Sequence, residues 1–340
     1  MPSDTLHRPL RTLRISVTDR CNLRCAYCMP EEEYSWIKND HVLSFEEISS
    51  LVDAFIAEGV GKVRLTGGEP LVRRDIETLV RLLAKKNLED LAMTTNGVLL
   101  ADKAASLKDA GLARITVSLD TLSPTKFLAL TRRAQHGEVL AGIAEAQRAG
   151  FAHPLKIDTV LMRGVNDDEL IPLLDFAGRH QAELRFIEYM DVGGATNWSM
   201  ERVVSRAEIL DRLSKALGRI EPIIERSSAP AERFRLPDGR AFGIIASTTQ
   251  PFCQSCDRSR LTADGTWFTC LYATQGVDLK TPLRAGESSE ALSQRIAQVW
   301  GRRSDHGAEE RLALRESRGP LASASEMKTR PLLEMHTRGG

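Results

Sequence analysis

The sequence is poor in aromatic residues, carries no excess of either charge, and has no long apolar run. Aromatic side chains make up 5% of the 340 residues, and 46 basic residues balance 46 acidic ones. A chain without net charge gives no general electrostatic reason to bind nucleic acid or an anionic membrane, so any phosphate site must be local. The amino terminus also lacks the apolar core of a secretory signal. We therefore expect a cytoplasmic protein that binds neither nucleic acid nor membrane.

Cysteine is scarce as well, but the six cysteines fall into two groups of three. The first group, within "TDRCNLRCAYCMP", is Cys21, Cys25 and Cys28, and the second is Cys253, Cys256 and Cys270. Three thiols leave one without a disulfide partner, and a structural zinc site normally uses four protein ligands. An iron–sulfur cubane held by three cysteines leaves one iron open to another molecule. On spacing alone, structural zinc, two halves of one site and six unrelated reduced thiols remain alternatives.

The main pattern along the chain is an alternation of short branched apolar segments with longer segments of helical period. The predicted strands are 13–17, 62–66, 91–94, 114–119, 155–161 and 183–188. The predicted helices are 45–58, 76–86, 101–110, 139–149, 169–179 and, further along, 207–217. Repeated strand–helix units predict an α/β fold, either a parallel barrel or a doubly wound sheet.

Two of the predicted helices begin with the spacing of a capping box. In this motif a serine side chain and a glutamate three residues later bind each other's free backbone N–H groups. Ser44 with Glu47 has this spacing, and so has Ser205 with Glu208. We expect helices to begin at both serines.

The alternation fades after about residue 197, which predicts two parts. Residues 1–196 are expected to form the α/β core and residues 197–340 an extension. Residues 301–330 are rich in Arg, Glu and Ser with little periodicity, so we expect a solvated or partly flexible tail there.

Unusual residues follow or occupy the predicted strands. In strand order these are the first cysteine group, "TGGEP" (66–70), "TTNG" (94–97), "SLD" (118–120), Lys156 and "FIEYMDVGG" (186–194). Because chemistry gathers at the carboxyl ends of parallel strands, we expect one mouth of the fold to collect all of them.

The spacing of the first cysteine group, with Tyr27 before the last cysteine, resembles the signature of the radical S-adenosylmethionine (SAM) superfamily. In that family three cysteines hold a [4Fe-4S] cluster, and its fourth iron binds the amino and carboxylate groups of SAM. Reductive cleavage then yields a 5′-deoxyadenosyl radical. "GGEP" is similar to the glycine-rich motif of the family, in which Gly67 and Gly68 would let the backbone approach the methionyl ammonium.

Within this superfamily, the chain resembles the GTP 3′,8-cyclases of molybdenum cofactor biosynthesis. The matching segments are "LRISVTDRCNLRCAYCMP", "RLTGGEPLVR", "MTTNG", "VSLDTL", "FIEYMDVG", "FCQSCDRSRLTADG" with Cys270, and the terminal "GG". The resemblance implies an incomplete (β/α)6 barrel, similar to a TIM barrel, with a carboxyl-terminal extension that carries a second [4Fe-4S] cluster. It also implies a lyase that converts GTP into (8S)-3′,8-cyclo-7,8-dihydroguanosine 5′-triphosphate after the radical removes the ribose 3′ hydrogen.

The resemblance assigns roles to individual residues. The first cluster would be held by Cys21, Cys25 and Cys28, and the second, whose free iron binds guanine in the family, by Cys253, Cys256 and Cys270. SAM would contact Tyr27, Gly68, Ser118 and Met190. GTP would contact Arg14, Arg64, Thr95, Lys156, Arg258, Ser259 and Arg260. The expected catalytic residues are Arg14, Arg258 and Arg260, which would stabilise electron and proton uptake, and Gly339 and Gly340, which would enter the pocket.

Three positions depart from the family pattern. Asp257 stands in place of a commoner Asn, Ser259 in place of an apolar residue, and Thr337 with Arg338 in place of an apolar pair before the glycines. None of these is a predicted cluster ligand.

The resemblance also implies partners. These are GTP, an external electron donor and a cyclic pyranopterin monophosphate synthase that receives the product, and the chain would act as a monomer or a homodimer. Two alternatives remain: another radical SAM enzyme with an auxiliary cluster, and a non-enzymatic zinc or iron–sulfur binding module. The second alternative does not explain "TGGEP", "TTNG" or the cations.

Overall fold

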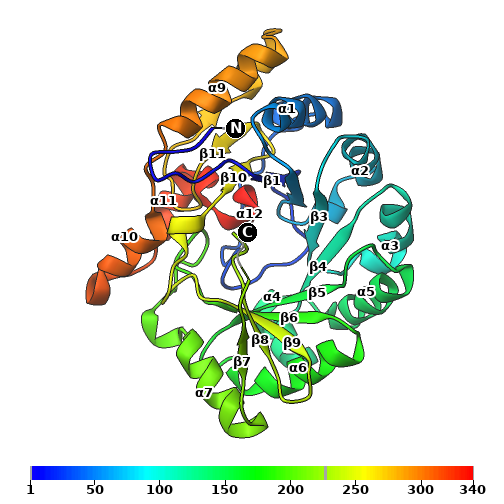
Figure 1. Ribbon diagram of the computed structural model, residues 1–340, viewed down its shortest axis with the longest axis vertical. Coiled ribbons are helices and arrows are strands. Elements are labelled where there is room, and N and C mark those ends of the chain that lie inside the picture. The colour runs from blue at the N-terminus through cyan, green and yellow to red at the C-terminus, as the bar shows by residue number, and fades with distance from the viewer. Residues whose placement is uncertain (1, 226–227, 340) are drawn as a thin grey trace.

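One curved sheet organises the chain in the computed structural model, which describes residues 2–225 and 228–339. Within these residues the twelve strands have the order β12-β11-β10-β1-β2-β3-β4-β5-β6-β9-β8-β7. The six central strands are parallel and follow in chain order: β1 (Thr12–Ser16), β2 (Lys62–Thr66), β3 (Asp90–Thr95), β4 (Arg114–Ser118), β5 (Lys156–Leu161) and β6 (Glu183–Glu188). Figure 1 shows the sheet as an open ring with helices outside it. The predicted α/β fold and all six predicted strands are confirmed.

The extension adds a parallel strand to each edge of this sheet. β10 (Arg258–Leu261) pairs parallel with β1, and β9 (Ala241–Ile245) pairs parallel with β6. Antiparallel strands follow outside them: β11 (Thr266–Phe268) and β12 (Val277–Asp278) beyond β10, and β8 (Glu232–Arg235) and β7 (Glu221–Ile223) beyond β9. The parallel part of the sheet is therefore wider than the six units predicted, and no edge of the core is left unpaired.

Most of the helices lie outside the ring, whereas the last one lies at its centre. Those of the core are α1 (Phe45–Ala57), α2 (Ile76–Ala84), α3 (Leu100–Asp109), α4 (Pro124–Thr131), α5 (His136–Ala149) and α6 (Leu170–Arg179). Those of the extension are α7 (Arg206–Leu217), α8 (Lys280–Arg284), α9 (Ser289–Gly301), α10 (Gly307–Ala313), α11 (Ala324–Thr329) and α12 (Met335–Arg338). Short 3-10 turns occupy Asn39–His41, Pro70–Val72, Asp167–Glu169, Met200–Arg202, Cys253–Ser255, Arg315–Ser317 and Pro331–Leu333. Over the described residues, we find no helix with the length and apolar character needed to cross a membrane.

Capping explains where two of these helices begin. At α1 both bonds of the capping box form, between Ser44 and Glu47. At α7 the side chain of Ser205 accepts a hydrogen bond from the backbone N–H of Glu208. Both predicted starts are confirmed, because each serine satisfies an N–H group that the first helical turn leaves free. The second box is only half formed, since the Glu208 carboxylate binds Arg163 instead.

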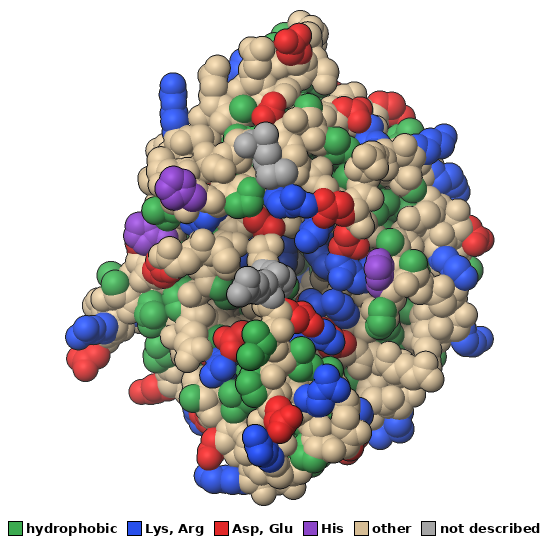
Figure 2. Space-filling view, in the orientation of Figure 1, with side chains coloured by type: hydrophobic (Ala, Val, Ile, Leu, Met, Phe, Trp, Pro, Cys, Tyr) green, Lys and Arg blue, Asp and Glu red, His purple; other side chains and the backbone are tan. Residues whose placement is uncertain are grey.

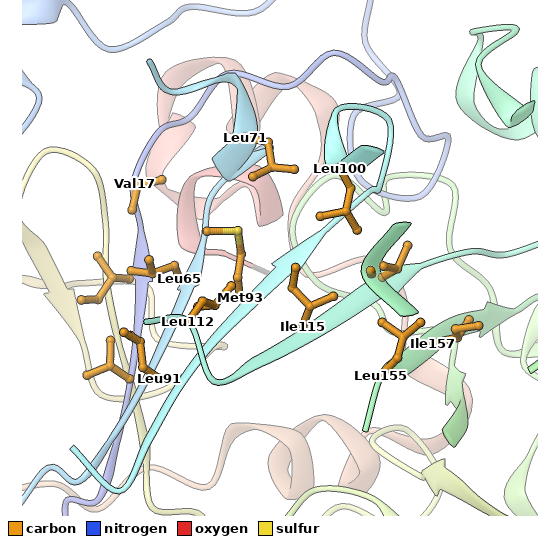
Figure 3. Packing of buried hydrophobic residues seen from close by; sticks show 14 of the residues in the cluster. Val17, Leu65, Leu71, Leu91, Met93, Leu100, Leu112, Ile115, Leu155 and Ile157 are labelled. Atoms are coloured by element: carbon orange, nitrogen blue, oxygen red, sulfur yellow. The ribbon is translucent and has the colours of Figure 1, made fainter. Parts of the chain in front are cut away.

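The hydrophobic core fills the space between the strands and the outer helices. Figure 3 shows Leu65, Met93 and Ile115, from three neighbouring strands, on the same face of the sheet. All three are fully buried. Successive side chains of a strand point to opposite faces of the sheet. The residues that alternate with these three along their strands therefore face the interior of the ring. The sequence thus reserves one face of each strand for the core and the other for the site.

Residues 301–330, predicted to be a solvated or partly flexible tail, are exposed at about half of their positions, but two buried arginines anchor the segment to the fold. Arg303 and Arg318 are 4% and 6% exposed. Arg303 lies 3.0 Å from Asp305, and Arg318 donates two hydrogen bonds of 2.9 Å to Asp191. Composition does not predict this anchoring, because Asp191 is distant in the sequence and the partly exposed Asp305 gives no periodic signal.

Candidate active site

The first cysteine group lies in the loop after β1, at the carboxyl end of the parallel strands. Cys21, Cys25 and Cys28 are free thiols and partly exposed. Burial raises the pKa of the Cys25 thiol, and the neighbouring Cys28 and Cys21 raise it further, because three thiolates would repel one another. The three sulfur atoms therefore share one small region, in which burial and mutual repulsion disfavour the thiolate form.

The glycine-rich loop after β2 packs directly on this cysteine loop. The backbone N–H of Gly68 donates to the carbonyl of Thr18, and that of Glu69 to the carbonyl of Arg20, both at 2.8 Å. A Cβ atom on Gly68 would lie 2.4 Å from the Arg20 oxygen. Only glycine permits this approach, so "TGGEP" fixes the position of the loop that carries the cysteines.

Glu69 joins this glycine loop to the loop after β3. Its carboxylate, 1% exposed, accepts hydrogen bonds from the N–H of Leu71 (3.0 Å), the hydroxyl of Thr95 (2.7 Å) and the N–H of Asn96 (2.7 Å). Burial raises the pKa of Glu69 to about 7, although these three donors act in the opposite direction. The Asn96 side chain in turn donates to Cys21 Sγ at 3.8 Å. Three loops at this end are thus held as one unit.

The predicted SAM contacts surround the same mouth. Tyr27 donates a 2.7 Å hydrogen bond to Asp120, which follows β4. Burial raises the pKa of Asp120 to about 6, although the Tyr27 hydroxyl lowers it. Ser118 ends β4 and Met190 follows β6, and both are partly exposed. Tyr27, Gly68, Ser118 and Met190 therefore come from four separate strand ends.

The donor set of the first group fits a [4Fe-4S] cluster. Soft thiolates favour iron–sulfur clusters or zinc over magnesium and calcium. Over residues 2–225 and 228–339, no three His, Cys, Asp or Glu side chains are placed to hold one metal ion. In a cubane each cysteine binds its own iron, so its ligands lie further apart than around a single ion. The partly exposed thiols, beside a backbone that glycine keeps open, are suited to a cluster with one accessible iron.

Cations line the interior of the ring. Arg14, Arg64 and Lys156 lie on the strand face opposite the hydrophobic core. Burial lowers the pKa of Arg14 to about 9, and the charges of Arg260 and Arg258 contribute. Burial likewise lowers the pKa of Arg64 to about 9 and that of Lys156 to about 8, again with help from nearby arginines. Figure 2 shows Lys and Arg side chains around a hollow at the centre of one face.

These cations have few partners. Within the described part of the chain, the Arg14 side chain makes no hydrogen bond or ion pair. Arg64 donates only to the hydroxyls of Thr94 (2.9 Å) and Thr116 (3.2 Å), and Lys156 Nζ lies 3.9 Å from Glu183. Partly buried cations that repel one another, with one carboxylate at 3.9 Å among the three of them, would be stabilised by a bound polyanion.

The expectation that one mouth collects all the unusual residues holds for the five loop motifs but not for Lys156, which is the first residue of β5. Arg14 and Arg64 lie in the middle of their strands. The three cations therefore line the depth of the ring below the cysteine loop. Alternation along a strand indicates which side chains face inward, but not how far from the strand end the ligand lies.

The second cysteine group lies at the opposite end of the ring. Cys253 and Cys256 precede β10, whose first residue, Arg258, is level with Thr12 at the start of β1. Cys270 follows the antiparallel strand β11 and returns to the same end. Burial would raise the pKa of Cys256, but Arg258 and Arg303 outweigh it and lower the pKa to about 7. This thiol is thus readily available as a thiolate ligand.

The carboxyl-terminal tail enters the ring between the two groups. Figure 1 places α12 and the end of the chain at its centre. Arg260 donates hydrogen bonds to the carbonyl oxygens of Arg338, at 3.1 Å, and of Gly339. Gly339 has φ of +67°, and a Cβ atom on it would lie 1.8 Å from the hydroxyl of Thr66. Gly340 lies outside the described residues.

Comparison with known proteins agrees with this geometry. The family model of the Radical SAM superfamily matches residues 15–177, and that of Molybdenum Cofactor Synthesis C matches residues 182–309. GTP 3′,8-cyclase 1 of Mycobacterium tuberculosis (strain ATCC 25618 / H37Rv) is 56% identical over 99% of this chain and 95% of its own. The GTP 3′,8-cyclase of Acidothermus cellulolyticus is 49% identical over 95% of this chain and 91% of its own. The chain belongs to the GTP 3′,8-cyclase family.

A solved structure outside the cyclases shows the same fold. Streptococcus suis SuiB bound to S-adenosylmethionine superposes with a TM-score of 0.60 and 14% identity, covering 91% of this chain and 68% of its own. At this identity the similarity concerns the fold alone. The much higher identity to the cyclases is what assigns the family.

Two of the predicted GTP contacts in this cyclase chain do not face the ring interior. Ser259 pairs with the core residue Leu13, and Thr95 pairs with the core residue Val117, so both side chains lie on the helix side of the sheet. The Thr95 hydroxyl is bonded to Glu69. The other predicted contacts, Arg14, Arg64, Lys156, Arg258 and Arg260, are brought together inside the ring.

Sequence reasoning missed several residues that hold the cyclase site in place. These are Glu69, Asn96, Asp120 and Asp191. Each stood inside a motif that had already been singled out, namely "TGGEP", "TTNG", "SLD" and "YMDVGG". A polar residue directly after a buried strand was the available signal, but its partner lies in another loop and has no trace in the local pattern.

Proposed function

We propose that the chain is a radical SAM lyase that converts GTP into 3′,8-cyclo-7,8-dihydro-GTP for molybdenum cofactor biosynthesis. One observation carries the proposal: a single ring has three thiols at each end and a cluster of mutually repelling cations between them. The first end fits a cluster and SAM, and the interior fits a nucleotide triphosphate. The membership of the chain in the cyclase family supports the same substrate.

The first cysteine group would hold the cluster that binds SAM. When bound, the cluster and SAM supply a 5′-deoxyadenosyl radical able to take the ribose 3′ hydrogen. In this proposal Tyr27, Gly68, Ser118 and Met190 orient SAM at the mouth of the ring. The hydrogen bond from Tyr27 to Asp120 keeps this wall in place, and closure of the mouth excludes water that would otherwise reach the radical.

The interior cations would bind the triphosphate. Arg14 and Arg64 offer planar guanidinium groups that can each pair with two phosphate oxygens, and Lys156 adds a point charge. A bound polyanion would also relieve the repulsion that lowers the pKa of each of these groups. Binding energy from the phosphates would thus fix the ribose relative to the radical source.

The second cysteine group would hold the second cluster, at the end of the ring where guanine is expected to bind. Its three thiols come from two segments that β10 and β11 bring together. Arg8 and Arg303 donate to the carbonyls of Cys253 (3.0 Å) and Cys256 (2.9 Å), which fixes the backbone of the site. Like the first group, it supplies three soft ligands and leaves room for a fourth from elsewhere.

The cyclised nucleotide must take up one electron and one proton. We propose that Arg14, Arg258 and Arg260 stabilise the developing negative charge, since they form one cluster next to the second cysteine group. Gly339, held by Arg260, and Gly340 would complete the pocket wall. The electron would come from an external donor, and the product would pass to a cyclic pyranopterin monophosphate synthase. We place this reaction in the cytoplasm, where thiols stay reduced.

The test is anaerobic incubation of iron-reconstituted protein with GTP, SAM and dithionite. Mass detection should find 5′-deoxyadenosine together with the cyclised nucleotide. Formation of 5′-deoxyadenosine without the nucleotide would retain the radical chemistry and exclude GTP as substrate. Metal analysis separates the structural alternative: about eight iron per chain is expected for two cubanes, whereas stoichiometric zinc would contradict the proposal.

A further inference from the structure

The end of the tail docks on the loop that carries the first cysteine group. His336, in α12, is 3% exposed. Its ring meets Tyr34 edge to face, with centroids 5.2 Å apart and planes at 86°, and meets Trp36 at 5.9 Å and 71°. Both aromatic residues follow Cys28 in the same loop. This favourable geometry for aromatic pairs gives the tail a specific seat on the loop.

Arg24 ties this seat to the cysteines. Its guanidinium lies 5.8 Å from the ring centroid of Tyr34 and 5.5 Å from that of Trp36. The same guanidinium donates 2.8 Å hydrogen bonds to the carbonyls of Cys21 and Leu23. We call Arg24, Tyr34 and Trp36 the aromatic cradle. Its shape depends on the cysteine loop, because one of its three members is bonded to the backbone of a predicted cluster ligand.

A buried carboxylate lies beside His336, and one backbone hydrogen bond holds this residue in the cradle. The Nδ1 of His336 lies 3.1 Å from Glu334 Oε2, and neither atom makes a hydrogen bond among the described residues. The backbone N–H of His336 donates a hydrogen bond to the sulfur of Cys28. The preceding residue, Met335, packs closely on Gly193 in the loop after β6. A Cβ atom on Gly193 would lie 2.4 Å from the backbone nitrogen of Met335. The start of α12 is therefore wedged between two loops of the radical SAM mouth.

The other end of the same short helix reaches the second cysteine group. Arg338 donates a 2.6 Å hydrogen bond to the carbonyl of Leu271, the residue after Cys270. Arg260 binds the carbonyl oxygens of Arg338 and Gly339. Only Thr337 separates His336 from Arg338, so one turn of helix connects the two ends of the site.

We propose that His336 is a positioning residue that couples order in the first cysteine loop to the placement of Gly339 in the ring. The effect on catalysis rests on the proposed function, whereas the coupling between loop and tail does not. When the loop is ordered, the cradle is formed and holds the imidazole of His336, which keeps Gly339 beside Thr66. By linkage, a docked tail also stabilises the loop. The site of radical formation and the wall of the pocket thus both depend on α12.

Hydrogen exchange of the iron-reconstituted protein tests the coupling without any turnover. His336→Ala should raise amide exchange about tenfold or more in both 331–339 and 31–37, while β2 to β5 stay unchanged. His336→Phe, which keeps an aromatic ring, should restore protection in both segments. His180→Ala is the matched control. The imidazole of His180 packs on Phe176 of α6, with centroids 4.5 Å apart, outside the ring of strands. This variant should leave both segments unchanged.

Three results would overturn the proposal. The first is unchanged exchange of the tail in His336→Ala, and the second is increased exchange in the tail alone, because then the loop would not respond. The third is failure of His336→Phe to restore protection, because then the ring would not provide the seat.

A second readout separates positioning from simple loss of structure. In His336→Ala the ratio of 5′-deoxyadenosine to cyclised nucleotide should rise about tenfold at saturating SAM, and His336→Phe should bring the ratio back. A destabilised enzyme would lose both products in proportion, which would contradict a positioning role. If the wild-type chain formed no cyclised nucleotide, the proposed function would fail, and hydrogen exchange would still decide the coupling.

Discussion

At the residue scale, the buried charges of this protein fall into two kinds. Arg318 is paired with Asp191 at 2.9 Å, so its burial is compensated within the fold. Arg14 has no such partner within the described residues, and burial together with Arg260 and Arg258 lowers its pKa to about 9. An unpaired buried cation weakens the folded state. We therefore attribute its presence to the proposed anion site rather than to stability.

Lys156 makes this reasoning testable through pH. Burial and then Arg185 lower its pKa to about 8. The affinity of the protein for inorganic triphosphate should therefore fall as pH rises from 7 to 9 and Lys156 loses its proton. Lys156→Arg stays charged and should show a weaker pH dependence in isothermal titration calorimetry. An equal dependence in both proteins would show that Lys156 does not bind the anion.

The same shift has the opposite sign for stability. In the unfolded chain a lysine keeps its proton to about pH 10.4, so between pH 8 and that value the unfolded state binds more protons. This group therefore makes the folded state relatively more stable as pH rises through that window. Urea unfolding at several pH values, compared with Lys156→Met, isolates the contribution.

Gly339 gives a second prediction at this scale. Alanine there would adopt φ of +67°, which costs about 1–2 kcal/mol for a residue with Cβ, and its Cβ would lie 1.8 Å from the Thr66 hydroxyl. Gly339→Ala should displace the tail and reduce cyclisation at least tenfold, with 5′-deoxyadenosine formation and Tm nearly unchanged. Thr66→Ala in the same chain should recover part of the cyclisation, since it removes the hydroxyl. A double variant no better than Gly339→Ala would contradict the contact.

At the scale of elements, the loops at the carboxyl ends of the strands act together rather than singly. Glu69 accepts hydrogen bonds from Leu71, Thr95 and Asn96, while the glycine loop is bonded to the cysteine loop. The mouth of the ring is therefore one braced surface. A change in one loop should be felt in the cysteine loop.

Glu69→Gln tests this bracing. The glutamine amide would set an N–H₂ group against the N–H of Asn96 or of Leu71, and leaving a buried donor unpaired costs about 1–3 kcal/mol. The free energy of unfolding of the variant, measured by urea denaturation, should be lower by that amount. The variant should also bind SAM more weakly. Glu47→Gln, at the exposed start of α1, is the control and should leave SAM binding unchanged. Unchanged SAM affinity in Glu69→Gln would show that the loops do not act together.

Elements with a strong local period could be predicted from the sequence, and those defined by distant partners could not. The predicted limits of β2 and β6 match the structure, because branched apolar residues alternate there. β10, "RSRL", was missed because its arginines face the ring and its pairing partner is β1, far away in the sequence. β10 is nevertheless the strand that carries Arg258 and Arg260 into the site.

The same limit applies to the candidate site. The cysteine spacing and "TGGEP" identified the mouth of the ring, since their chemistry is local. The orientation of Ser259 could not be predicted, because it depends on the register between β10 and β1. The seat of His336 could not be predicted either, because it lies on a loop remote in the chain. Motifs thus located the ends of the site, and the fold determined what connects them.

At the scale of the whole molecule, the two cysteine groups lie at opposite ends of one ring. Cys25 belongs to the loop at the carboxyl ends of the strands, and Cys256 precedes β10 at the amino ends. The interior cations and the tail lie between them. This arrangement predicts that the two groups have separable roles.

Serine substitutions test that separation. Each of Cys25→Ser and Cys256→Ser should reduce the iron content from about eight to about four per chain, as expected for loss of one cubane. Cys256→Ser should still cleave SAM but form no cyclised nucleotide, whereas Cys25→Ser should do neither. Iron analysis and product mass detection measure these outcomes. Cyclisation by Cys256→Ser would contradict a role for the second group in binding GTP.

The pairing of β1 with β10 also affects how the chain is made. β1 leaves the ribosome roughly 240 residues before its neighbour β10, which at usual elongation rates is on the order of 10 to 50 s. During that interval one edge of the new sheet exposes unpaired N–H and C=O groups, the kind of edge that joins other chains. The nascent core is therefore most prone to aggregate before β10 has been synthesised. Slower translation of the extension would lengthen that exposure.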